Sequence, residues 1–208
     1  TTAALLRRFY DPLSGQVCID GHDLRTLSQD SIGRHVSMVL QEPFLFSGTI
    51  FENIRYASVT KNAVDVERAA QAVGAHDFIA RLPGDYQFVL DQGGGNLSLG
   101  QRQLISFARA LVADTRILVL DEATANVDSY SERKIQRALK ILLEGRTAIV
   151  IAHRLATIRD CDRILVLNHG RLVEEGSHQE LMDIDGLYAR LCRLNYASFD
   201  DVPSSAIR

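Results

Sequence analysis

A run of four aliphatic residues that ends in two adjacent carboxylates constrains this chain more than any other feature. Residues 117–120 read Ile-Leu-Val-Leu and lead directly into Asp121 and Glu122. A continuous apolar run is typical of a buried strand in a parallel sheet, and open α/β sheets bind ligands beyond the carboxyl ends of their strands. Two carboxylates there suit a nucleotide site, in which Asp121 reaches Mg²⁺ and Glu122 deprotonates an attacking water. Taken alone, the run is equally typical of an ordinary strand end.

Apolar periodicity predicts helices and strands in alternation. Helix 101–112 places Leu104, Phe107, Ala108 and Leu111 on one face. The other predicted elements are helix 1–10 with Ala4, Leu5 and Phe9 apolar, strands 16–21 and 36–40, helices 64–73 and 76–82, strand 116–120, helix 130–143 with Ile135, Ala138, Leu139 and Leu142 apolar, strands 147–151 and 163–167, and a hairpin over 164–173. Such alternation points to a parallel sheet with helices on its faces.

Composition is that of a globular domain in a reducing compartment. The 208 residues allow one domain, or one core with an inserted subdomain. The net charge is −3 and the sequence contains no cluster of basic residues, so it gives no sign of a positively charged surface that would bind nucleic acid. Cys18, Cys161 and Cys192 form no CxxC pair, which favours reduced thiols over disulfides or a zinc site. No run of about eighteen apolar residues is present, so nothing in this sequence is expected to span a membrane.

Five segments resemble, in the family's own order and spacing, the motifs of ATP-binding cassette (ABC) ATPases. They are a Q-loop at Val39–Pro43, a signature at Asn96–Gln103, a Walker B strand at Leu118–Glu122, a D-loop at Asn126–Asp128 and a switch-histidine strand at Ile149–Arg154. Phe46, Thr49, Ile50, Asn53, Ile54 and the segment 170–182 resemble exporters of this family. The resemblance covers nearly all of residues 1–195, and chance agreement of five ordered motifs is negligible.

The resemblance implies an α/β fold of the P-loop NTPase (RecA-like) type, a parallel-sheet core with an inserted α-helical subdomain. Residues 1–42 and 115–195 would form the core, residues 43–114 the helical subdomain with the signature, and residues 196–208 a flexible tail. The family's phosphate-binding loop, G-x-x-G-x-G-K-[ST], is not in this sequence. Arg7–Pro12 resembles the end of the helix that follows that loop, which puts Thr1 at or just after the loop's final Ser/Thr. We therefore expect the N-terminal part to be missing, and the isolated fragment to bind ATP poorly and to be inactive.

The resemblance also assigns roles at the catalytic edge. Glu122 would activate the attacking water, His153 would hydrogen-bond to the γ-phosphate or that water, and Asp121 would bind Mg²⁺. Gln41 would touch both Mg²⁺ and the water and would couple the site to the helical subdomain. Without the resemblance, a residue such as His153 is more often a structural histidine, and Gln41 would be an ordinary surface glutamine.

The signature opens helix 101–112. Free N–H groups at a helix start favour an anion, and the resemblance makes Ser98, Gly100 and Gln101 contact the γ-phosphate bound by a second subunit. A simple N-cap by Ser98 is the plainer interpretation, and both can hold. Leu99 stands where the family usually has Gly, so a left-handed backbone there would be costly.

Two further residues complete the expected nucleotide contacts. Asp128 would contact the partner subunit's phosphate loop, or merely cap helix 130–143, and Thr1 would end the phosphate loop. Gly93–Gly95 is interpreted as a flexible approach to the signature, and Val89–Gln92 as a surface facing the coupling helices of a transmembrane domain.

The function implied is ATP binding and hydrolysis by an ABC exporter, with ATP and Mg²⁺ as cofactors. The expected partners are a second nucleotide-binding domain and a transmembrane domain fused N-terminally, with no nucleic acid. The expected location is the cytoplasmic face of a plasma or bacterial inner membrane. Two alternatives stay open: an importer or non-transporter ABC ATPase, and a degenerate regulatory cassette.

Overall fold

The computed structural model describes residues 2–121, 129–151 and 155–200. The chain forms two compact units, Thr1–Ile151 and Ala152–Arg208. Each is described by itself below. Glu122, His153, Asp128 and Thr1 lie outside the described residues.

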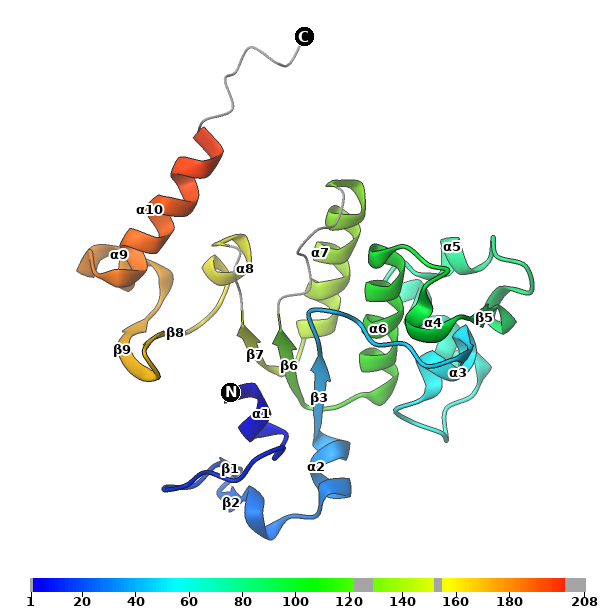
Figure 1. Cartoon of the computed structure of the whole chain (residues 1–208), viewed down its shortest axis with the longest axis horizontal. Coiled ribbons are helices and arrows are strands. Elements are labelled where there is room, and N and C mark those ends of the chain that lie inside the picture. The colour runs from blue at the N-terminus through cyan, green and yellow to red at the C-terminus, as the bar shows by residue number, and fades with distance from the viewer. Residues whose placement is uncertain (1, 122–128, 152–154, 201–208) are drawn as a thin grey trace. The chain divides into compact units, whose positions relative to one another are not determined.

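A three-stranded parallel sheet forms the centre of the first unit (Figure 1). Its order is β3 (Val36–Val39), β6 (Ile117–Asp121), β7 (Thr147–Ile151). The middle strand, β6, is buried at its three inner residues because it has a neighbour on each side. The predicted parallel sheet is confirmed.

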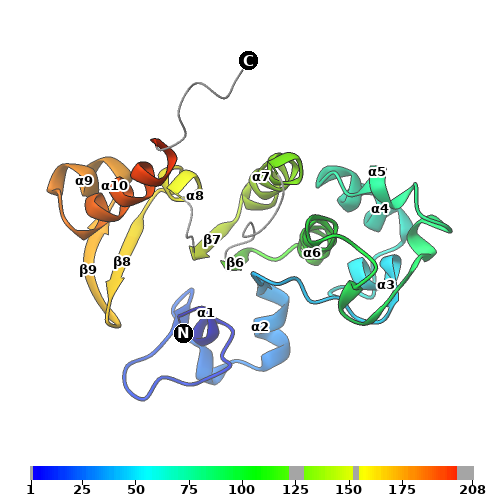
Figure 2. The same ribbon diagram turned by 45° about the horizontal axis from the view of Figure 1, so that its top comes forward.

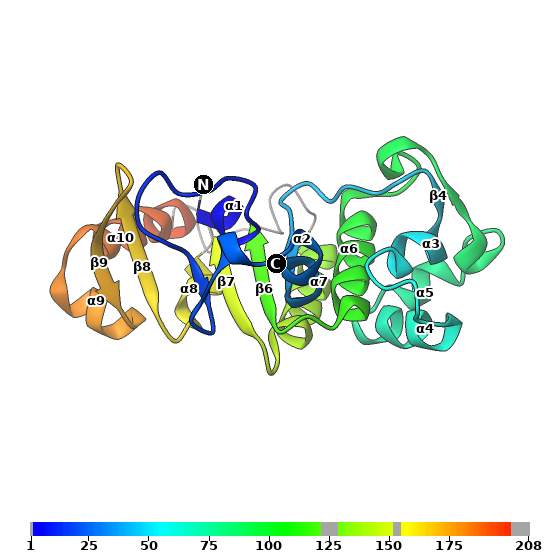
Figure 3. The ribbon, with the colours of Figure 1, turned by 90° about the horizontal axis from the view of Figure 1, so that it is seen from below.

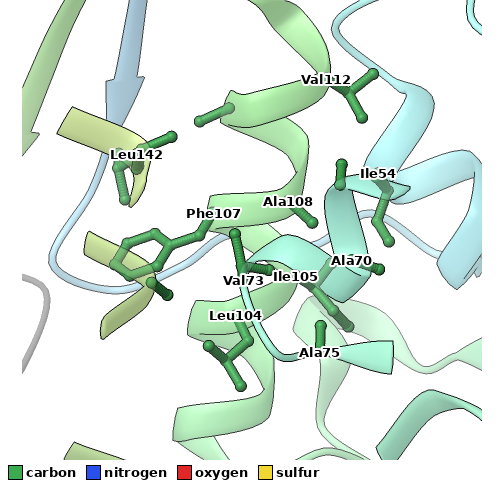
Figure 4. Close-up of a cluster of buried hydrophobic side chains, with 14 of the residues drawn as sticks. Ile54, Ala70, Val73, Ala75, Leu104, Ile105, Phe107, Ala108, Val112 and Leu142 are labelled. Atoms are coloured by element: carbon green, nitrogen blue, oxygen red, sulfur yellow. The ribbon is translucent and has the colours of Figure 1, made fainter. Parts of the chain in front are cut away.

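The helix α6 (Leu99–Ala113) lies between α7 (Ser129–Leu143) on one side and α3 (Ile50–Arg55) and α4 (Ala63–Ala72) on the other, as Figures 2 and 3 show. Phe107 points from α6 toward Leu142 of α7, while Ile105 faces Val73 at the end of α4 (Figure 4). The apolar faces predicted for both long helices are confirmed: all but Leu111, which is half-buried, are buried. Because α6 is packed on both sides, it connects the sheet to the helical part of this unit.

The N-terminal segment builds a smaller apolar cluster of Ala3, Leu24, Ile32, Val36 and Val119. Its elements are α1 (Thr2–Leu6), the antiparallel strands β1 (Cys18–Ile19) and β2 (His22–Asp23), the 3₁₀ helix η1 (Leu24–Thr26) and α2 (Gln29–His35).

The helix predicted over residues 1–10 is too long. It ends at Leu6, because Arg8 has a left-handed φ of 52°. The Arg8 guanidinium instead donates to the carbonyls of Leu24 and Leu27, at 3.1 and 2.9 Å. Phe9, expected on the apolar face, is 60% exposed.

Between β3 and α6 the chain forms short elements that apolar periodicity does not reveal. They are β4 (Gly48–Thr49) and β5 (Val89–Leu90), which pair antiparallel, and the 3₁₀ helices η2 (Asp85–Gln87) and η3 (Gln92–Gly94). The helix predicted over residues 76–82 is present but shorter, as α5 (His76–Ile79). The glycine run before the signature is a packed turn rather than the expected flexible approach. Gly94 is buried at φ 71°, and a Cβ there would lie 2.9 Å from Leu45 Cδ1.

The second unit contains the predicted hairpin, β8 (Ile164–Asn168) with β9 (Arg171–Gly176), turned through His169 and Gly170 in left-handed conformations. Three helices accompany it: α8 (Leu155–Arg159), α9 (His178–Ile184) and α10 (Leu187–Asp200), so residues 196–200 of the expected tail are helical. Its core comprises Ile164, Val166, Leu181, Tyr188 and Cys192. Among the described residues, no helix combines the length and apolarity needed to cross a bilayer.

Candidate functional site

Two of the predicted site residues, Gln41 and Asp121, lie at the carboxyl ends of adjacent strands of the parallel sheet. In the parallel ladders, Val39 of β3 pairs with Leu120 of β6, and Asp121 of β6 pairs with Ile151 of β7. Gln41, two residues past the end of β3, is exposed, and the Asp121 side chain is half-buried. Gln41 and Asp121 therefore leave adjacent strands at the same edge.

The sequence continues this arrangement past the described residues. Glu122 follows Asp121 directly, and His153 stands two positions after Ile151. Both lie outside the described residues. Their roles, like those of Asp128 and Thr1, stay predictions.

The donors at this edge fit Mg²⁺ bound with a nucleotide. A carboxylate (Asp121) and an amide oxygen (Gln41) are hard oxygen ligands, and Mg²⁺ in nucleotide sites uses one or two carboxylates together with substrate phosphates and waters. Among the described residues there is no group of three or more His, Cys, Asp or Glu able to hold a metal alone.

The signature residues form a complete helix cap. Ser98 is the N-cap of α6: its Oγ accepts from the Gln101 amide at 3.2 Å, while Gln101 Oε1 accepts from the Ser98 amide at 2.9 Å. The helix start leaves the N–H groups of Leu99 and Gly100 without an acceptor among the described residues. These two amides, at the positive end of a 15-residue helix, are the groups available to an anion.

Leu99 causes no backbone strain at this position. It is the first residue of α6, and positive φ among the described non-glycine residues occurs elsewhere. The cost expected for a left-handed leucine therefore does not arise.

The loop before the signature is held from two sides. Asn96 Nδ2 donates to the Val89 carbonyl at 3.0 Å, and the Asp91 amide donates to Asn96 Oδ1 at 3.2 Å. From inside α6, Arg102 Nη1 donates to the Leu97 carbonyl at 2.8 Å. The loop is thus fixed to both β5 and the helix that it precedes.

An aromatic hollow follows the Q-loop segment. Its volume is about 460 Å³, and its lining consists of Phe46, Ser47, Glu52, Asn53, Arg55, Tyr56 and Val59. The rings of Phe46 and Tyr56 stack at 4.3 Å, and Phe44 meets Phe46 edge-on at 5.0 Å. Tyr56 and Val59 are 60% and 75% exposed, which is unusual for an apolar pair on one patch. We call this the aromatic pocket.

Sequence reasoning did not identify Arg109, the residue beneath this pocket. From α6 its guanidinium donates to the Phe44 carbonyl and to both the carbonyl and Oδ1 of Asn53, at 2.8–2.9 Å. It also lies over the rings of Phe46 and Tyr56. Burial lowers the pKa of Arg109 to about 10, so the side chain stays charged at neutral pH. The only sequence signal was an arginine among the apolar positions of α6.

Comparison with known proteins gives consistent results. A family model described as "ABC transporter" matches residues 1–125. Over 198 residues the chain is 52% identical to the uncharacterized ABC transporter ATP-binding protein YknV of Bacillus subtilis, covering 95% of this chain and 33% of that protein. It is 46% identical to an ATP-dependent lipid A-core flippase of Syntrophus aciditrophicus, covering 94% of this chain and 33% of the flippase.

A solved structure of a bacterial Atm1-family ABC exporter with ATP bound matches with a TM-score of 0.86 and 42% identity, over 93% of this chain and 34% of the exporter. The chain thus spans about a third of the length of these relatives.

Proposed function

The chain belongs to the ABC transporter family, and on that premise we propose that it is the ATP-binding and ATP-hydrolysing part of a longer exporter. The observation that carries the proposal is the register of the sheet: Asp121 is the last residue of β6, and Gln41 stands two residues past the end of the neighbouring strand β3. The similarity to a lipid A-core flippase and to an Atm1-family exporter favours an exporter over an importer or a soluble family member.

The chemistry at this edge would be in-line transfer of the γ-phosphoryl group of ATP to water. Asp121 and Gln41 would hold Mg²⁺, which offsets the negative charge of the phosphates. Glu122 would accept a proton from the attacking water while the water oxygen bonds to the γ-phosphorus and the bond between the γ-phosphorus and the ADP oxygen breaks. His153 would hydrogen-bond to the γ-phosphate and orient that water.

The signature would act on a nucleotide held mainly by another domain. The amides of Leu99 and Gly100 have no acceptor among the described residues, and a phosphate is favoured at such a helix start. We propose that a second nucleotide-binding domain presents its bound ATP to Ser98, Gly100 and Gln101, with Asp128 at the partner's phosphate loop. Two such sites would form when the domains close together, and hydrolysis would reopen them.

The aromatic pocket would receive the membrane part of the same protein. Its exposed aromatic and aliphatic side chains suit a stable contact with a largely apolar partner surface. The relatives are about three times as long as this chain, so they contain further segments that could supply such a partner. We propose that a helix end from the transmembrane segments seats in the pocket. With such docking, the chain would lie at the cytoplasmic face of a membrane.

Hydrolysis by the full-length protein in lipid tests the proposal. Asp121→Asn should abolish Mg²⁺-dependent release of phosphate from ATP, because the metal loses its carboxylate. Asp114→Asn is the matched control: Asp114 is an exposed residue before β6, in a left-handed conformation that asparagine tolerates. Full hydrolysis by Asp121→Asn would overturn the assignment.

A further inference from the structure

A buried amide on helix α6 lacks a hydrogen-bond acceptor. Gln103 is 1% exposed, and its Nε2 has no acceptor among the described residues. No other buried side-chain nitrogen or oxygen in the described part of the chain is left unpaired. Buried polar groups are hydrogen-bonded as a rule, and an unpaired one lowers the stability of the fold that buries it.

Gln103 stands where the packing of α6 favours an apolar residue. Phe107 and Ala110, one and two turns further along, share its face of the helix, and both are buried. Phe107 points toward Leu142 of α7 (Figure 4). A methionine or leucine at position 103 would fill the same space without burying an unpaired donor. Residues that break a local rule in this way are expected at functional sites.

Gln103 is also the last residue of the signature segment. It follows the N-cap residue Ser98 by five positions, which is about 7.5 Å along the helix axis. Between them, the amides of Leu99 and Gly100 have no acceptor among the described residues and suit an anion. Because these groups belong to one short stretch of the same helix, an anion that shifts the helix start also moves Gln103.

We propose that Gln103 is a positioning residue whose amide gains an acceptor, a backbone carbonyl oxygen of this chain, only when an anion is bound at the start of α6. The unpaired amide then disfavours the packing without nucleotide, and its hydrogen bond favours the packing with nucleotide. The inference rests on the proposed function, because it takes the anion to be the γ-phosphate of ATP.

The test compares Gln103→Met with the unmodified full-length protein. Methionine keeps the length of the side chain and removes the donor. Without nucleotide, the midpoint of thermal unfolding should rise by about 2 °C or more, because the unpaired group is gone. The affinity for the magnesium complex of adenylyl imidodiphosphate, a non-hydrolysable ATP analogue, should fall by about fivefold or more. The affinity for ADP, which has no γ-phosphate, should stay within about twofold.

Leu104→Met is the matched control. Leu104 is the next residue of α6 and is also buried, but this change removes no donor. It should neither raise the midpoint nor weaken binding of the analogue, since a swap that conserves volume is well tolerated. The opposite signs of the two effects expected for Gln103→Met distinguish positioning from a structural role. A glutamine that only holds a buried water would lose stability on replacement and leave the nucleotide affinities unchanged.

Two results overturn the inference. The first is a lower midpoint for Gln103→Met without nucleotide, or failure of this variant to fold, since the amide would then already be paired. The second is an unchanged affinity for the analogue, which would leave the proposed function standing. An unmodified full-length protein that binds neither nucleotide would instead contradict the proposed function itself.

Discussion

Asp121, the last residue of β6, pairs in parallel register with Ile151, the last residue of β7. On the other side of β6, strand β3 runs parallel to it, and Gln41 stands two residues past the end of β3. Asp121 and Gln41 therefore lie at the carboxyl ends of adjacent strands.

Replacing the proposed base should stop turnover and spare binding. Glu122→Gln removes the proton acceptor but keeps the shape of the side chain, so we expect hydrolysis by the full-length protein to fall between about a hundredfold and ten-thousandfold. The affinity for ATP, measured by equilibrium binding, should stay within about twofold of that of the unmodified protein. A change of this size is too small to indicate a lost contact. Glu144→Gln, at an exposed turn after α7, is the control and should change neither. Turnover that survives Glu122→Gln would remove Glu122 from the mechanism.

A comparison of two of the capping boxes in this chain can distinguish a structural role of Ser98 from a role in ligand binding. Ser98 with Gln101 begins α6, and Ser177 with Glu180 begins α9 in the same geometry. Ser98→Ala and Ser177→Ala should each lower stability by about 1 kcal/mol, measured by denaturant unfolding. Only Ser98→Ala should also raise the KM for ATP. An equal rise for both variants would mean that Ser98 acts as a cap alone.

Restoring the glycine usual in the family should bring no benefit. Leu99→Gly places a flexible residue where the backbone is already helical, so we expect a loss of stability of no more than about 1 kcal/mol. The kcat/KM for ATP should not improve. A clear gain in kcat/KM would show that the signature needs a backbone conformation other than the one described.

Alkaline pH should destabilise the first unit through Tyr86. Burial, with smaller contributions from the charges of Glu67 and Asp85, raises the pKa of Tyr86 from its ordinary 10.0 to about 12. The folded state therefore holds the phenol proton more tightly than the unfolded state. Its contribution to stability is complete below pH 10 and is lost as the pH rises toward about 12.

Tyrosinate absorbance measured during a pH titration of the folded protein tests this assignment. Tyr86→Phe should remove the step near pH 12 and flatten the fall in stability over that range. Because Tyr86 also bonds to His76 Nδ1 at 2.9 Å, the variant will be less stable at neutral pH as well. An unchanged titration curve would assign the step to another tyrosine.

The long elements could be predicted because their apolar residues repeat with a fixed period. Leu104, Phe107 and Ala108 fall on one face of α6, and residues 117–120 form one unbroken run. Helix α1 was predicted too long because an arginine gives no indication in the sequence that its backbone will be left-handed, as that of Arg8 is. Strands β4 and β5 have two residues each, too few for any period to appear.

The residues of the candidate site also divide into those that could be predicted from the sequence and those that could not. The positions of Asp121 and Gln41 at a sheet edge could be predicted because each directly follows a predicted strand, and the ends of parallel strands meet at a sheet edge. Arg109 was not, since its role comes from oxygens 56 and 65 residues away. A contact that exists only after folding leaves no pattern in the neighbouring sequence.

The Glu174 carboxylate, in the second unit, accepts the N–H groups of Leu187 and Tyr188 and so fastens the start of α10 to strand β9. A Cβ at Gly186 would collide with that same carboxylate. The length of the connection between α9 and α10 is therefore fixed, and an inserted tag there would detach the helix. The exposed turn at His169 and Gly170 carries no such restraint, which makes it the better place for a label or an epitope in this unit.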